Sequence, residues 1–176
     1  MSAAGQPSGL DRFLTTIDRL SEVSGRASAW FVAPLILAVT YEVGARYLFR
    51  APTVWAYDLS YMLYASIFML GAAYTLRHGA HVRTDFLYND FSDRRKAQID
   101  AVGYALFLAT LAFLLFSITR EAYHSWDIDE RSGESPWRPP LYPLKWMLVV
   151  ALVLLFLQSV AEFVRALVAA RRRPTA

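Results

Sequence analysis

Four long apolar runs alternate with short polar segments along the chain, at about residues 27–47, 55–76, 97–119 and 144–168. Each run is close to the roughly 20 residues that a helix needs to cross about 30 Å of hydrocarbon. Membrane helices tolerate single breaks such as Pro34, Gly71 and Gly103. The pattern therefore predicts an all-α integral membrane protein with four transmembrane helices and a membrane domain at residues 27–168.

The segment before the first run has a different pattern. Apolar residues recur there at helical spacing among charged ones, at Leu10, Phe13, Leu14, Ile17 and Leu20. This pattern is typical of an amphipathic helix on the membrane surface, and it fits a cytoplasmic extension of the first span equally well. We assign residues 1–26 to a cytoplasmic tail that contains this helix and residues 169–176 to a basic cytoplasmic tail. No small-residue cleavage pattern is present, so we expect the first span to stay in the membrane.

The composition supports the membrane class and narrows the chemistry. Of 176 residues, 56% are hydrophobic and 19% are charged, whereas soluble domains average roughly 45–50% and about 25%. The chain has no cysteine, which excludes disulfides, thiolate metal sites, covalent c-type haem and cysteine nucleophiles. It has only three histidines, and we expect it to carry no metal or other cofactor.

Lysine and arginine are distributed unevenly between the two sides that four spans define. Twelve of the 18 lie before the first span, between the second and third, or at the end of the fourth and after it. Cytoplasmic segments carry such an excess, so we expect both termini to be cytoplasmic. The formal charge of +3 includes no long basic stripe, and nucleic acid is not an expected partner.

The centres of the four runs contain no charged residue. A transporter that works alone needs polar or charged groups near the bilayer midplane. Gln158 is the most polar residue there, and we interpret it as the donor or acceptor of an interhelical hydrogen bond.

Ionisable residues gather instead at the span ends. Glu42 and Arg46 lie four residues apart on one helix face, and Asp58 enters the membrane from the same side. We expect these three residues to form a cluster at the outer interface, with separate snorkelling side chains as the alternative. The outer connection, at about residues 120–143, is mixed in charge and proline-rich. It is either a docking surface for an extracytoplasmic partner or a solvated connector.

The end of the second span presents a polar turn on the cytoplasmic side, with Gly79 as the position at which the helix ends. The turn carries Arg77, His78, His81, Arg83 and Asp85. A metal site of His78, His81 and Asp85 is one interpretation, but the two arginines disfavour a cation. A hydrogen-bonded, ion-paired turn that fixes the hairpin fits these residues better.

Taken in order, these motifs resemble the small membrane subunit of tripartite ATP-independent periplasmic (TRAP) transporters, the DctQ family. The resemblance covers about residues 27–165. Its elements are Arg46-Tyr47, Trp55 followed three residues later by Asp58, Gly71-Ala72-Ala73, the turn from Arg77 to Asp85, Gly133-Glu134, Lys145 and Leu157-Gln158. Two positions depart from the family: many relatives carry glutamate where this chain has Asp58, and the last helix starts here with Pro143-Leu144-Lys145.

The resemblance implies a three-part importer in the bacterial inner membrane. Its partners are a periplasmic substrate-binding protein and a large permease subunit that carries the substrate and sodium sites. This chain is then a non-catalytic scaffold within the lipid bilayer that supports sodium symport of organic acids. Candidate structural or subunit-interface residues are Glu42, Arg46, Trp55, Asp58, Arg77, His81, Arg83, Asp85, Lys145 and Gln158.

Two other classes compete with this interpretation. A small four-helix membrane enzyme or haem protein is the first, but haem ligation needs facing histidines inside helices. His78 and His81 fall in a turn, and His124 lies near the opposite side. A stand-alone exporter is the second, and it would need a membrane-embedded acid. Glu42 is the one candidate for that role, and it lies close to the end of its span.

Overall fold

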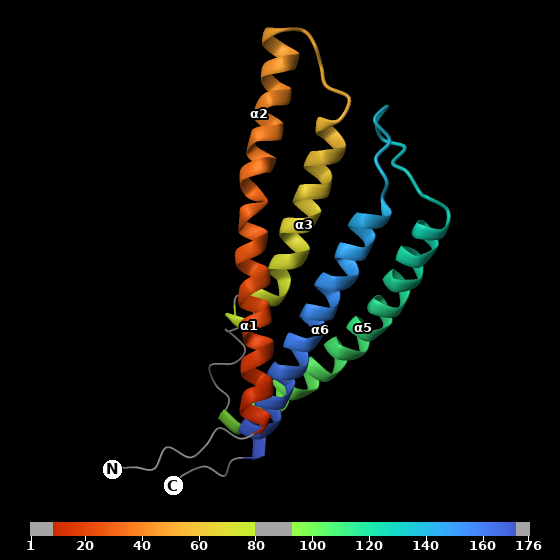
Figure 1. The fold of residues 1–176 in the computed structure, drawn as a ribbon. Coiled ribbons are helices and arrows are strands. Elements are labelled where there is room, and N and C mark those ends of the chain that lie inside the picture. The colour runs from red at the N-terminus through yellow and green to blue at the C-terminus, as the bar shows by residue number, and fades with distance from the viewer. Residues whose placement is uncertain (1–8, 80–92, 172–176) are drawn as a thin grey trace.

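A computed structural model of the chain describes residues 9–79 and 93–171. Within these ranges it consists of the helices α1 (Gly9–Trp30), α2 (Val32–Leu48), α3 (Ala56–Arg77), α5 (Asp93–Asp127) and α6 (Tyr142–Arg171) (Figure 1). Four helical stretches are long and apolar enough to cross a membrane: Gly9–Leu48, Ala56–Arg77, Gln98–Asp127 and Tyr142–Ala169. The predicted all-helical chain with four candidate spans is confirmed.

A single residue, Phe31, separates α1 from α2. Pro34 lies three residues further on and has no N–H to donate to the carbonyl of Trp30, so the regular helix is interrupted there. The chain nevertheless continues in nearly the same direction (Figure 1). The amphipathic segment is therefore helical and continuous with the first span, which favours the extension over a separate surface helix.

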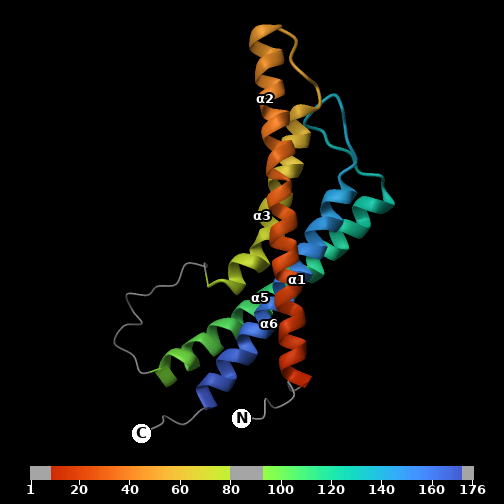
Figure 2. The same cartoon turned by 60° about the vertical axis from the view of Figure 1, so that its left-hand side comes forward.

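The two hairpins α2–α3 and α5–α6 pack directly against each other through α3 and α6, and α1 packs against both of these helices. Figures 1 and 2 show α5 and α6 side by side, with their pair inclined to α1 and α2. We call the end of the bundle where α1 begins and α6 finishes the terminal end. The opposite end, with the connections 49–55 and 128–141, is the loop end.

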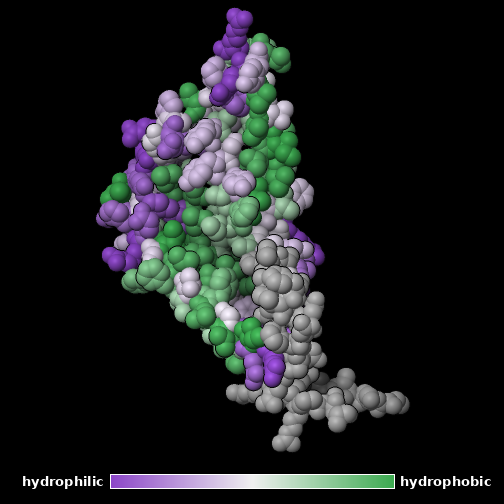
Figure 3. Space-filling model, turned by 180° about the vertical axis from the view of Figure 1, so that it is seen from behind, coloured by the Kyte–Doolittle hydropathy of each residue, from purple (hydrophilic) through white to green (hydrophobic). Residues whose placement is uncertain are grey.

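The interior is built from small and branched side chains. Leu76, Leu111 and Leu155 form a buried cluster between α3, α5 and α6. Ala73, Ala122 and Ala161 are completely buried, because small residues let membrane helices approach closely. Many large apolar side chains point outward instead. On the face in Figure 3, hydrophobic residues cover the middle of the helices, and hydrophilic ones lie mostly toward the ends.

The C-terminal ends of α3 and α5 test the predicted polar turn after the second span and the predicted outer connection after the third. α3 ends at Arg77, and the N–H of Gly79, at φ +64°, donates to the carbonyl of Leu76 at 3.1 Å, so Gly79 ends the helix as predicted. α5 continues to Asp127, so the connection before α6 starts several residues later than the predicted position of about 120. Residues 120–127 contain neither glycine nor proline, and the buried Ala122 and Ser125 hold this last part of α5 in the bundle.

Candidate functional site

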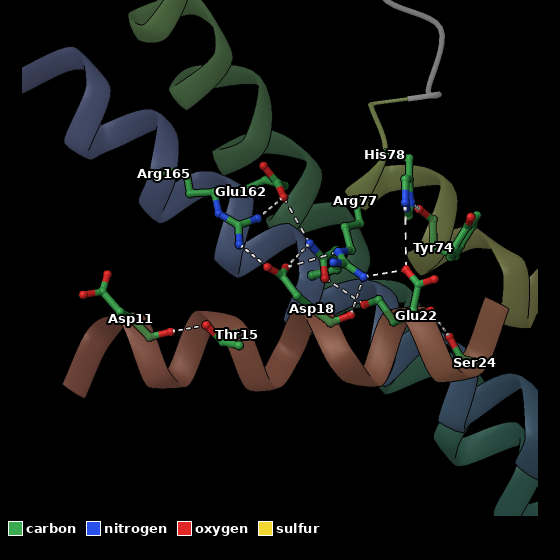
Figure 4. Close-up of polar contacts among 12 residues, drawn as sticks. Asp11, Thr15, Asp18, Glu22, Ser24, Tyr74, Arg77, His78, Glu162 and Arg165 are labelled. Carbon is green, nitrogen blue, oxygen red and sulfur yellow. Dashed lines mark hydrogen bonds and ion pairs between the residues drawn. The ribbon is translucent and has the colours of Figure 1, made fainter. Parts of the chain in front are cut away.

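A network of charged and polar side chains joins α1, α3 and α6 near the terminal end (Figure 4). We call it the junction network, and its members are Asp18, Ser21, Glu22, Arg77, Gln158, Glu162 and Arg165. The Asp18 carboxylate of α1 accepts a hydrogen bond from Arg165 of α6 at 2.7 Å. Arg77 of α3 donates to the Glu22 carboxylate at 2.6 Å and to the Asp18 carbonyl at 3.0 Å. Two acids of α1 thus hold one arginine from each hairpin.

Gln158 lies at the centre of the network and is completely buried. Its carbonyl oxygen accepts a hydrogen bond from the Ser21 hydroxyl at 2.7 Å. Its amide nitrogen donates to Asp18 at 3.2 Å and to Glu162 at 3.0 Å. The oxygen and both N–H groups therefore have partners, which a buried amide needs. Gln158 makes the interhelical hydrogen bond that its position predicted.

Three acids and two arginines give the network a formal charge of −1. The side chains of Asp18, Glu22, Glu162, Arg77 and Arg165 are 17–36% exposed. Charged groups taken partly out of water must be paired to offset the lost hydration. Arg165 also bonds Glu162, and Arg26 lies 3.2 Å from Glu22. Every charged group of the network thus has an oppositely charged partner.

The backbones of α1 and α3 approach closely beside the network. A Cβ built on Gly25 would lie 2.4 Å from Cγ of Tyr74 and 2.6 Å from its Cβ. The Tyr74 ring in turn packs on the His78 ring at a centroid distance of 4.2 Å. Ser28 donates to the Gly25 carbonyl of its own helix at 2.8 Å. Gly25 is therefore required for this close contact.

The loop end has a second set of polar contacts around Asp58. This carboxylate of α3 is completely buried. It accepts a hydrogen bond from the Ser132 hydroxyl at 2.7 Å and another from Ser135. Both serines belong to the connection between α5 and α6, so Asp58 attaches that connection to the other hairpin.

Glu42 anchors the connection between α2 and α3. It accepts a hydrogen bond from the backbone N–H of Thr53 at 2.9 Å and another from the Thr53 hydroxyl. Arg46 donates to the same carboxylate from one helical turn away at 2.8 Å. Trp55 stacks on Tyr41 at a centroid distance of 5.7 Å. Glu42 and Arg46 pair as predicted. Asp58 does not join them but bonds Ser132 and Ser135, so the two carboxylates hold different connections.

Lys145, in the first turns of α6, holds the end of α5. Its ammonium group donates to Glu121 at 2.7 Å and also to Glu130. The pKa of the Glu130 carboxyl lies below its ordinary value of 4.5, and the hydrogen bond from Lys145 makes the largest contribution to this lowering. This carboxyl is therefore ionised at neutral pH, as the ion pair requires.

The remaining predicted residues divide into two groups. His81, Arg83 and Asp85 lie outside the described residues. Arg77 is described, and its partners are the acids of α1. Sequence reasoning missed these acids and the buried serines of α1. A signal for the serines was present, because Ile17, Ser21, Ser24 and Ser28 recur at helical spacing and are all buried.

The described residues contain no group of three or more metal-binding side chains that could hold an ion. The contacts at the terminal end join helices to one another, and those at the loop end join the connections to the helices. Within the described ranges their chemistry is that of hydrogen bonds and ion pairs that position elements.

Comparison with known proteins shows which family the chain belongs to. Residues 35–169 match the family model described as tripartite ATP-independent periplasmic transporters, DctQ component. The chain is 26% identical over 136 residues to the sialic acid TRAP transporter permease protein of Haemophilus influenzae, which covers 72% of this chain and 21% of that protein. It is 29% identical over 73 residues to the sialic acid TRAP transporter small permease protein of Vibrio cholerae, which covers 40% of each chain. The match thus spans less than half the length of either relative.

Proposed function

Because the chain belongs to the DctQ component family of TRAP transporters, a non-enzymatic family, we propose that it is the small membrane subunit of such a transporter and holds the large permease subunit in the bilayer. One observation carries the scaffold role. The central segments 32–41, 59–76, 101–119 and 146–161 contain no acidic or basic residue. A helper subunit needs no path for ions, whereas a carrier of charged solutes does.

The orientation follows from the ends of the bundle. The terminal end carries Arg12, Arg19, Arg26 and Arg77, and cytoplasmic segments hold the excess of such residues. We assign this end to the cytoplasm and the loop end to the periplasm of a bacterial inner membrane. The helical stretch Gly9–Leu48 has 40 residues, about 60 Å at 1.5 Å per residue. Since roughly 20 residues span the membrane, the other half of this stretch, which is most of the charged helix α1, extends beyond the hydrocarbon.

The transported substrate and the coupling ion belong to partners of this chain. Both relatives named above are sialic acid transporter proteins by name. We propose that the complex imports an organic acid delivered by a periplasmic binding protein. Sodium coupling is assigned to the large subunit, because this chain has no charged residue at mid-membrane.

The connection 128–141 is the proposed contact for the binding protein. Asp58, through Ser132, and Lys145, through Glu130, fix it at the periplasmic end. The exposed side chains that it presents include Asp129, Arg131, Glu134, Trp137 and Arg138. A mixed-charge surface with an exposed tryptophan suits a transient protein contact better than a lipid contact.

Reconstitution tests the proposal. Vesicles would contain this chain alone, the large subunit alone, or both, each with the binding protein, labelled sialic acid or small carboxylates, and an inward sodium gradient. We expect uptake only when both membrane subunits are present, and loss of uptake when potassium replaces sodium outside. Transport by this chain alone, or full uptake without it, would contradict the scaffold role.

A further inference from the structure

The outward face of α3 differs from the other outward faces of the bundle. It carries Tyr57, Tyr61, Tyr64 and Phe68, which are 63%, 47%, 57% and 67% exposed. Their spacing of four, three and four residues places them on one side of a helix. We call these four residues the tyrosine stripe. The Tyr64 and Phe68 rings contact each other at a centroid distance of 5.6 Å.

The hydroxyl groups of the stripe are poorly suited to lipid. Among the described residues, none of the three tyrosines has a hydrogen-bond partner. Tyr64 lies eight residues after the start of α3, about 12 Å along the helix axis in a hydrocarbon layer about 30 Å thick. Tyr57 can reach the headgroups, where tyrosine is common. A hydroxyl at the depth of Tyr64 finds no partner in lipid tails.

The outward faces of α2 and α5 are mostly aliphatic or phenylalanine at mid-helix. At mid-helix α2 exposes Ile36, Leu37, Val39 and Val43, and α5 exposes Leu106, Phe113, Leu114 and Phe116. Thr110 is also exposed on α5, but its hydroxyl bonds the Leu106 carbonyl of its own helix at 3.1 Å. Thr40 and Tyr41 of α2 and Ser117 of α5 are exposed as well, and α3 differs from these helices by aligning three tyrosines on one face.

A groove extends the stripe toward the loop end. It measures about 330 Å³ and is lined by Tyr57, Tyr61, Ser132, Gly133, Glu134 and Leu141. It combines two aromatic rings with polar atoms of the connection 128–141. Aromatic residues with unmatched polar tips are the kind that contribute most to protein interfaces.

We propose that the tyrosine stripe is the surface that binds the large permease subunit, through a transmembrane helix that presents hydrogen-bond acceptors to Tyr61 and Tyr64. The partner rests on the proposed function, and the position of its contact is the new inference. Lipid would leave the hydroxyls without partners, whereas carbonyl, serine or asparagine oxygens of a neighbouring helix satisfy them. The faces of α2 and α5 then remain toward lipid.

Photo-crosslinking in the assembled transporter tests the position. p-Benzoylphenylalanine would replace Tyr64 or Phe68, with Phe116 and Phe113 of α5 as controls of similar exposure, at 63% and 69%. All four sites carry an aromatic ring already, so the replacement is conservative. We expect cross-links to the large subunit from the two α3 sites, with at least about a fivefold lower yield from the α5 sites, because contact requires direct packing.

Three outcomes separate the two proposals. If the unmodified tagged chain does not retain the large subunit, the proposed function fails. If it does retain it but the cross-links come equally or mainly from α5, the stripe is not the interface and only this inference fails. A product that joins two copies of this chain from the α3 sites also overturns the inference.

Removal of the hydroxyls tests the chemistry. Tyr61→Phe with Tyr64→Phe keeps both rings, and Tyr47→Phe with Tyr123→Phe is the matched control on α2 and α5. We expect the α3 pair to speed dissociation of the detergent-solubilised complex by roughly three- to tenfold, as loss of one or two interhelical hydrogen bonds would. Unchanged dissociation, or an equal effect of the control pair, would show that the hydroxyls have no partner in the complex.

Discussion

Gly25 decides how closely α1 approaches α3. We expect Gly25→Ala to destabilise the isolated chain by about 1–3 kcal/mol, as over-packing does. The added methyl would lie within 2.4–2.6 Å of the Tyr74 side chain, including its Cβ, which cannot move without moving α3. Thermal unfolding in detergent measures the effect.

Gly44 provides the matched control. It also lies within a helix, but a Cβ there meets no atom within 4 Å. Alanine favours the helix by roughly 0.5–1 kcal/mol over glycine, so Gly44→Ala is expected to leave the melting temperature unchanged or to raise it. Equal losses at the two positions would contradict the close contact.

Glu130 gives the bundle a pH-dependent contact at the loop end. The hydrogen bond from Lys145 lowers the folded-state pKa below the ordinary 4.5. The stabilisation is therefore complete above about pH 4.5 and is lost as the pH falls through the folded-state pKa. We expect the melting temperature of the wild type to exceed that of Glu130→Gln at pH 7, and this difference to shrink below pH 4.5. A constant difference across that range would exclude the ion pair as its source.

At the scale of elements, the length of the apolar runs predicted the four candidate spans well, because a helix that crosses a membrane needs a continuous run of buried or lipid-facing residues. The connections were predicted poorly. The sequence contains Asp58 and Ser132, but 74 residues separate them, and no local pattern pairs them. The expected cluster with Glu42 failed for the same reason: proximity in sequence suggested it, while packing of α3 against α6 placed Asp58 beside the other connection.

The Asp58 contacts predict the protease sensitivity of the connection 128–141. Trypsin can cleave after Arg131, whereas Pro139 blocks cleavage after Arg138. The backbone around Arg131 is held by hydrogen bonds from Ser132 to Pro139 and from Leu141 to Glu130, both 2.9 Å. Loss of the charged acceptor in Asp58→Asn removes about 1 kcal/mol of this restraint. We expect cleavage at Arg131 to become roughly fivefold faster.

The control is Asp127→Asn at the end of α5, whose side chain is exposed. It removes the same charge without touching the buried serines. The rate of appearance of the fragment that starts at Ser132 reports both variants. Similar rates for Asp58→Asn and the wild type would mean that the serine contacts do not hold the connection.

At the scale of the molecule, α1 is the helix that contacts both hairpins. Its role could not be predicted, because Asp18 and Arg165 lie 147 residues apart and a charged helix before the first span is equally compatible with a free tail. The amphipathic pattern located the helix. Its buried side proved to be the serine side, while Leu10, Phe13 and Leu20 remain exposed.

A double-mutant cycle measures how strongly α1 is coupled to α6. Asp18→Asn and Arg165→Gln, alone and together, should show a coupling energy of about 0.5–1.5 kcal/mol, in the lower part of the range for contacting groups because water still reaches Arg165. Asp129→Asn with Arg131→Gln is the control, since that pair is largely exposed and is expected to couple by less than about 0.5 kcal/mol. No coupling in the first cycle would mean that α1 is not joined to α6 by this pair.

The junction network also constrains the order in which the protein is made. Glu22 and Asp18 emerge from the ribosome early and can meet Arg77 once the first hairpin is in the membrane. Gln158, Glu162 and Arg165 are translated much later. Asp18 and Ser21 therefore lack these partners while the residues between α1 and α6 are synthesised. Closure of the bundle is therefore a late event of biogenesis, in which the last helix inserted completes contacts begun by the first.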